Sequence, residues 1–212
     1  MLLSPEQFLA FLAAALLITL SPGPDNLMVL SFGIARGRKQ GMTFGLGCAL
    51  GCLSHTLLAT LGVSALIAAS LWAFTALKVC GGLYLVWLGI QALKSRGSTF
   101  EAGQADNPNI EPLGKLFAKG LIANAINPKV VLFFLAFLPQ FVDASRGNIT
   151  WQTAQLGIVF TLQAILVFCL LGYFAGRVGQ CFMRSPRAGM WLDRFAGGVF
   201  VLLGMRLIIS KS

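Results

Sequence analysis

Apolar residues run in six long stretches along the chain, separated by short polar gaps. A helix needs roughly 20 consecutive apolar residues to cross a lipid bilayer. The six stretches cover residues 7–34, 42–69, 72–93, 116–142, 154–177 and 195–209. The pattern predicts an all-α integral membrane protein with six transmembrane helices.

Two of these stretches are interrupted in the same way by proline. The breaks are Ser21-Pro22-Gly23-Pro24-Asp25-Asn26 in the first stretch and Asn127-Pro128-Lys129 in the fourth. Proline removes a backbone donor, and in lipid the freed carbonyls must find partners in protein or in a water-filled cavity. Interrupted helices in matching positions of two halves mark the binding site in many transporters. We therefore interpret the chain as a small secondary transporter.

Composition and charge placement agree with a membrane protein. The chain is 57% hydrophobic and 11% charged, which leaves too few polar residues to cover a soluble domain. The net charge of +9 could indicate nucleic acid, but the basic residues gather in three gaps and form no single face. These gaps hold Arg36, Arg38 and Lys39, then Lys94, Arg96, Lys115 and Lys119, then Arg177, Arg184, Arg187 and Arg194. We expect a lipid bilayer as the environment and no nucleic-acid partner.

The three basic gaps follow the first, third and fifth stretches, whereas the opposite side holds only Arg146 and Lys211. Loops rich in Lys and Arg remain on the cytoplasmic side. Both termini are therefore predicted to be periplasmic. No Lys or Arg precedes the first stretch and Glu6 is acidic, so we expect that stretch to be kept as a helix and not cleaved as a signal peptide.

The two halves of the chain resemble each other. Residues 78–86 align with residues 194–202, and the breaks align at Pro24 and Pro128. Three helices per half is an odd number, so the second half would insert upside down as an inverted repeat. A chance likeness of glycine-rich helices is the alternative. The prediction is one transmembrane domain over 1–212, with repeats at about 1–93 and 115–212 and a cytoplasmic linker at about 94–114.

Asp25 and Lys129 are charged groups predicted at membrane depth, where charge is costly and usually functional. Asp25 and Asn26 could bind substrate or a coupling ion at the start of a half-helix, or merely cap the broken backbone. Lys129 could form a structural ion pair with Asp25, or a charge pair for which substrate or protons compete. A zwitterion would suit such a pair, with its amine at Asp25 and its carboxylate at Lys129. The residues leave these readings open.

Two further polar residues are candidates for substrate binding or coupling. His55 is the only histidine and lies inside the second stretch, where it could couple protons or simply bond a backbone carbonyl. Asn127 adjoins the second break, and for this reason we favour it over Asn124 and Gln163 as a cavity-lining residue.

The sequence offers little for catalysis or for metal binding. The five cysteines have no zinc-site spacing and are interpreted as small buried apolar residues. One histidine and one deep acid, without a nucleophile motif, argue against an enzyme, and we expect no catalytic residue, metal or cofactor. Glycine pairs four residues apart favour tight helix packing, and a homodimer is among the assemblies that they allow. The alternatives are export of another metabolite or a cation and, less favoured, a non-transport membrane protein.

Several motifs together resemble the LysE/RhtB family of amino-acid exporters. They are the two breaks, Leu132-Phe133-Phe134, Leu138-Pro139-Gln140-Phe141 and Lys78…Gly81-Gly82-x-Tyr84-Leu85-x-x-x-Gly89. The resemblance implies six transmembrane helices in a bacterial inner membrane. It also implies export of amino acids or close derivatives by proton antiport.

Members of that family differ in substrate. A single deep acid favours neutral amino acids such as threonine, homoserine or leucine over arginine and lysine.

Overall fold

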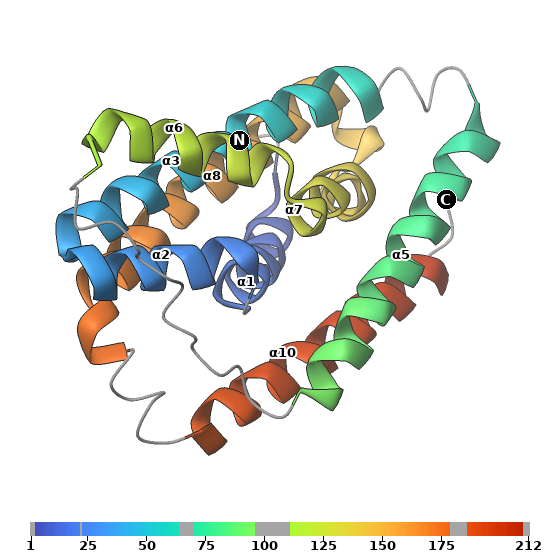
Figure 1. Cartoon of the computed structure of the whole chain (residues 1–212). Coiled ribbons are helices and arrows are strands. Elements are labelled where there is room, and N and C mark those ends of the chain that lie inside the picture. The colour runs from blue at the N-terminus through green and yellow to red at the C-terminus, as the bar shows by residue number, and fades with distance from the viewer. Residues whose placement is uncertain (1–2, 22, 64–69, 96–110, 179–185, 210–212) are drawn as a thin grey trace.

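A computed structural model describes residues 3–21, 23–63, 70–95, 111–178 and 186–209, and every regular element within them is helical (Figure 1). Pro22 and most of the predicted linker lie outside the described residues. The elements are α1 (Pro5–Leu20), α2 (Pro24–Arg36), α3 (Arg38–Leu58), η1 (Ala59–Val63), α5 (Leu71–Lys94), α6 (Leu113–Ala125), α7 (Pro128–Leu132), η2 (Phe133–Phe137), η3 (Leu138–Phe141), η4 (Ala144–Arg146), α8 (Ile149–Tyr173) and α10 (Pro186–Ile209).

Within the described residues, three helical segments are long and apolar enough to cross a membrane: Arg38–Gly62, Thr75–Lys94 and Ile149–Tyr173. Two bent pairs raise the number to as many as five if each pair is one broken span. The pair α1–α2 bends by 56°, and α6 bends by 50° against Pro128–Phe141. Helix α10 has 24 residues, but its charged positions Arg187, Asp193, Arg194 and Arg206 make it less apolar. The predicted number of six spans therefore stays a prediction.

Local side chains and turns set several helix ends. Ser4 and Gln7 form a capping box that starts α1 ahead of the apolar run. Helix α8 starts at Ile149 and not at the predicted residue 154, because the Asn148 side chain accepts a hydrogen bond from the Trp151 amide at 3.0 Å. Gly37, with φ of +96°, makes the sharp turn between α2 and α3 that a residue with a Cβ would strain.

Helix α3 packs against three neighbours through its glycines. A Cβ on Gly41 would lie 2.8 Å from the Cα of Gly33 on α2, and one on Gly45 would lie 2.9 Å from the Cβ of Phe168 on α8. On the third side, Gly51 approaches Asn124 of α6. Close backbone approach is how helices gain packing energy in lipid, where apolar burial supplies no drive. The glycine faces predicted from sequence are thus used inside the chain.

Helices α5 and α10 lie side by side as an antiparallel pair (Figure 1). A Cβ on Gly89 would lie 2.6 Å from the carbonyl oxygen of Gly197, and a Cβ on Gly197 would lie 2.6 Å from that of Gly89. Gly82 and Gly204 face each other in the same reciprocal manner. The contact between these two helices is therefore nearly symmetric.

An aromatic core lies beside the two breaks. The π-helical turn η2 buries Phe133, Phe134 and Phe137, and Phe133 lies 5.2 Å from Phe160 of α8 between ring centroids. Phe11 of α1 closes the cluster, 6.1 Å from Phe133. Aromatic pairs at such distances are favourable contacts, and they hold α1, η2 and α8 together around the interrupted segments.

Candidate functional site

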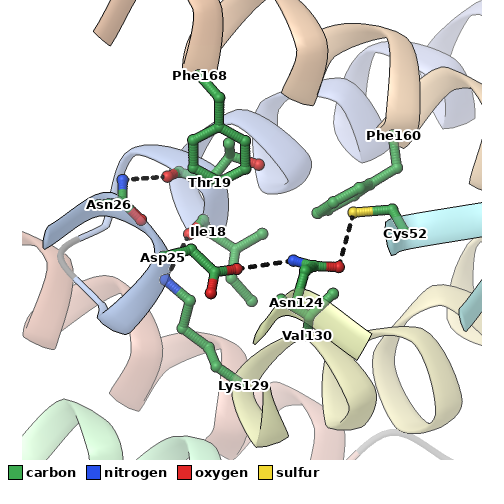
Figure 2. Close-up of a pocket in the computed structure, with 10 residues that line it drawn as sticks. All are labelled: Ile18, Thr19, Asp25, Asn26, Cys52, Asn124, Lys129, Val130, Phe160 and Phe168. Atoms are coloured by element: carbon green, nitrogen blue, oxygen red, sulfur yellow. Dashed lines mark hydrogen bonds between the residues drawn. The ribbon is translucent and has the colours of Figure 1, made fainter. Parts of the chain in front are cut away.

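A small cavity lies where the two breaks meet (Figure 2). Its volume of about 20 Å³ has room for roughly one water molecule. The lining comes from α1, α2, α3, α6, α7 and α8, and consists of Ile18, Thr19, Asp25, Asn26, Cys52, Asn124, Lys129, Val130, Phe160 and Phe168. An amino acid is larger than this cavity, so the helices would have to move apart to admit one.

Asp25 is buried in the first turn of α2, with 3% of its surface exposed. Its Oδ2 accepts a hydrogen bond from Nδ2 of Asn124 at 2.7 Å (Figure 2). Its Oδ1 is buried and has no hydrogen-bond partner within the described part of the chain. The carboxylate therefore does not cap the broken backbone; it presents one unsatisfied oxygen at the cavity.

Lys129 reaches across from the second break to the first. Its Nζ donates to the carbonyl oxygen of Ile18 at 3.0 Å (Figure 2) and to that of Ser21 at 2.9 Å, and both carbonyls are freed where α1 ends. Among the described residues, Lys129 and Asp25 form no ion pair within 4.0 Å. The two charged residues line the same cavity, but Lys129 is held by backbone carbonyls and not by the carboxylate.

Asn26 and Thr19 also complete the first break. Nδ2 of Asn26 donates to the carbonyl oxygen of Thr19 at 2.8 Å, which satisfies another carbonyl at the end of α1 (Figure 2). The hydroxyl of Thr19 accepts a hydrogen bond from Nε2 of Gln163 at 2.8 Å. The sequence allowed either Asp25 or Asn26 to bond the broken backbone. Of these two side chains, only Asn26 does so.

His55 of α3 lies behind the cavity wall, with 1% of its surface exposed. Its Nε2 lies 3.0 Å from the carbonyl oxygen of Asn124, and because a carbonyl only accepts, Nε2 carries the hydrogen. Its Nδ1 is buried without a partner among the described residues. Asn124 therefore links Asp25, through its side chain, to His55, through its backbone.

Asn127 lies outside the cavity lining. It is the N-cap of α7, where its Oδ1 accepts from the Lys129 amide at 3.0 Å and Pro128 occupies the first helical position. Asn124, which the sequence favoured less than Asn127, is one of the lining residues. Asn124 lies about one helical turn before the second break, and this position could have identified it as a lining residue from the sequence.

Two further polar residues line the cavity without having been predicted from the sequence, Thr19 and Cys52. Sγ of Cys52 lies 3.5 Å from Oδ1 of Asn124. Thr19 lies one position before the last residue of α1. A polar residue at membrane depth beside the first break was the feature of the sequence that could have identified it. Among the described residues, no three His, Cys, Asp or Glu side chains come together as a metal site would require. The groups at the cavity are suited to hydrogen bonding a polar organic molecule.

Interrupted apolar helices with buried charged groups at the breaks are the features of a secondary transporter. The chain belongs to the LysE type translocator family, whose model matches residues 16–211. The resemblance read from the motifs is thereby confirmed. A family of translocators also fits the expectation that the protein is not an enzyme.

Three relatives cover nearly the whole chain. A threonine efflux protein of Escherichia coli K12 is 35% identical over 96% of this chain and 98% of its own length. An uncharacterized membrane protein of Vibrio cholerae is 33% identical over 97% and 98%. A homoserine/homoserine lactone efflux protein of Salmonella typhimurium is 28% identical over 97% and 98%. No solved structure gives a significant match to this chain.

Proposed function

We propose that the protein exports neutral amino acids of the threonine or homoserine type from the cytoplasm in exchange for protons. The observation that carries the proposal is the buried carboxylate of Asp25, which leaves Oδ1 without a partner at a cavity between two broken helices. The family, and the names of the efflux proteins similar to this chain, support the cargo class.

The substrate ammonium and a proton would compete for the same carboxylate. A buried charge is costly unless it is paired or neutralised, so Asp25 would hold either a proton or the ammonium group at any time. Release of one on binding of the other is the elementary step of antiport. His55 would serve coupling indirectly: its Nε2–H donates to the Asn124 backbone carbonyl and so holds in place the side chain that donates to Asp25.

The substrate carboxylate would lie at Lys129 and at the start of α2. An ammonium group has three donors, and Lys129 uses two of them on Ile18 and Ser21. The first turn of α2 follows Gly23, which supplies no side-chain cap, so its amides and the positive end of the helix dipole favour an anion. The site would thus bind the substrate carboxylate at Lys129 and the α2 amides, and the substrate ammonium at Asp25.

We further propose that two inverted repeats, at about 1–93 and 115–212, move relative to each other to open the cavity. The reciprocal glycine contacts of α5 and α10, and a proline at the first position of both α2 and α7, support a repeat. The orientation, with both termini periplasmic in a bacterial inner membrane and the basic loops in the cytoplasm, follows from the charge distribution.

The test is counterflow from proteoliposomes loaded with all twenty amino acids, with and without a pH gradient. We expect release of a few neutral amino acids that depends on the gradient. Asp25→Asn should lower this release by about a hundredfold, because a neutral amide neither pairs with an ammonium nor carries the proton. Asp143→Asn, at an acid outside the cavity, should transport like the wild type. No amino-acid release from folded wild-type protein would overturn the proposal, and metal ions and other metabolites would be assayed next.

A further inference from the structure

Thr19 and Gln163 form a polar pair at the cavity that the proposed binding of ammonium and carboxylate does not use. Thr19 lines the cavity from α1, and Gln163 lies on α8, one turn beyond the lining residue Phe160. Both are buried, with 5% and 8% of their surfaces exposed. The Nε2–Oγ1 bond of 2.8 Å joins them.

The Thr19 hydroxyl is bonded differently from the hydroxyls of four other threonines in the helices. Four threonines each donate to the carbonyl four residues earlier, at 2.6–2.9 Å; they are Thr56, Thr60, Thr153 and Thr161. Thr19 accepts from Gln163, and no bond that it donates is found among the described residues. Its O–H is therefore free to donate, and Thr19 is a lining residue of the cavity.

Gln163 has an unused acceptor, whereas Thr19 has an unused donor. Its Oε1 is buried and has no partner in the described part of the chain. Leaving a buried carbonyl unpaired is costly, so a molecule that donates a hydrogen bond there would be favoured. If the Gln163 amide were rotated by 180°, the Thr19 hydroxyl would donate to Oε1, and Nε2 would be the group without a partner. The pair would then still offer one free donor, on Gln163, and one free acceptor, on Thr19.

We propose that Thr19 and Gln163 recognise the side-chain hydroxyl of the transported amino acid. Thr19 donates to the hydroxyl oxygen, and Oε1 of Gln163 accepts its hydrogen. A hydroxyl satisfies both partners, whereas a methyl group satisfies neither, an ammonium only donates and a carboxylate only accepts. The inference rests on the proposed function, because it requires the substrate amine to lie at Asp25 on the same cavity.

The test compares substrates that differ only by hydroxyl against methyl. Threonine is compared with valine, and homoserine with norvaline, by kcat/KM in proteoliposome counterflow. The wild type should prefer each hydroxyl substrate by about tenfold or more, the worth of one or two hydrogen bonds. Thr19→Val should lower threonine transport by about tenfold and leave valine transport within about twofold.

The matched control is Thr161→Val, which makes the same change at a buried threonine of α8 whose hydroxyl is bonded to its own backbone. Its threonine-to-valine ratio should equal that of the wild type. If Thr19→Val does not fold, Gln163→Leu makes the same test, with the same loss of preference expected. Equal transport of threonine and valine by the wild type, or an unchanged ratio in Thr19→Val, would overturn this inference and leave amino-acid export standing. Absence of all amino-acid transport would instead overturn the proposed function and the inference with it.

Discussion

The two broken helices restart alike but complete their backbones by different means. Both α2 and α7 begin with proline at the first helical position. The break between α6 and α7 is closed largely from within, by the Asn127 cap. The break between α1 and α2 has no side-chain cap, and its carbonyls depend on Asn26 and on Lys129, more than a hundred positions away.

This difference predicts how each break responds when its neighbours move. A self-capped break can keep its geometry when its neighbours move, whereas the first break must exchange partners whenever α7 moves relative to α1. The unsatisfied oxygen of Asp25 and the spare donor of Thr19 lie at or next to the first break. The first break therefore depends more on the position of its neighbours than the second break does.

The largest effect is expected from removing the long-range partner of the first break. Lys129→Met would leave the carbonyls of Ile18 and Ser21 buried without donors. We expect a loss of about 3 kcal/mol in unfolding free energy, since each orphaned carbonyl costs ~1–3 kcal/mol and relief of the buried charge offsets part of that. Unfolding in detergent at increasing denaturant measures it.

Lys39→Met, at an exposed lysine beyond the end of α2, is the control for loss of charge and should change stability little. Wild-type stability of Lys129→Met would show that the first break is held by something other than this lysine.

The second largest effect on stability is expected where α6, the helix before the second break, packs against α3. A Cβ on Gly120 of α6 would collide with the backbone carbonyl of Phe44 on α3, where no side chain can move aside. Gly120→Ala should therefore cost about 2 kcal/mol in unfolding free energy. Gly114→Ala, in the first turn of the same helix with open space around it, should be neutral or slightly stabilising. Equal effects of the two changes in thermal unfolding would contradict the packing argument.

A smaller effect is expected from the cap that closes the second break. Asn127→Ala removes the acceptor for the Lys129 amide and should cost about 1 kcal/mol in unfolding free energy. Asn127→Ser keeps a side-chain acceptor without adding a charge and should retain most of the stability. Transport by Asn127→Ala should persist, because this residue is a cap and not part of the cavity lining. Loss of transport at unchanged stability would assign Asn127 a direct role.

The smallest effect is expected at an ion cluster around Glu111, which precedes α6 and lies outside the membrane-spanning segments. Glu111 contacts Arg36 at the end of α2 at 3.2 Å and Lys119 of α6 at 2.5 Å. The hydrogen bond from Lys119, followed by that from Arg36, holds the pKa of Glu111 below its usual value of 4.5. A lowered folded-state pKa contributes stability above pH 4.5, and that contribution is lost as the pH falls through the folded-state value.

Glu111→Gln should therefore lower the melting temperature slightly at pH 7, by less than Asn127→Ala does, and the difference from the wild type should vanish at acid pH. A difference that persists once Glu111 is protonated in the folded state would mean that packing, and not charge, accounts for its contribution.

The sequence was most informative where backbone chemistry is local. Proline cannot sit inside a helix without loss of a bond, so Pro24 and Pro128 located both breaks, and the apolar runs located the helices. The helix ends were less well predicted, because α8 extends forward to the Asn148 cap, beyond the apolar run that suggested residue 154. At the site, proximity to the break favoured Asn127 over Asn124, which the fold reversed by placing Asn124 between Asp25 and His55.

By itself, then, the sequence determined the membrane class, the family, the two interruptions and the charged residues at them, since hydropathy and proline act over a few residues. Only the tertiary structure decided how those residues are paired. Lys129 lies at the carbonyls of α1 and not at Asp25, and Asp25, Thr19 and Gln163 are among the residues left with spare hydrogen-bonding capacity. Such pairings depend on which helices approach closely across more than a hundred residues of chain. Hydrogen bonds are short-ranged and directional, so only the packed helices determine which donor meets which acceptor.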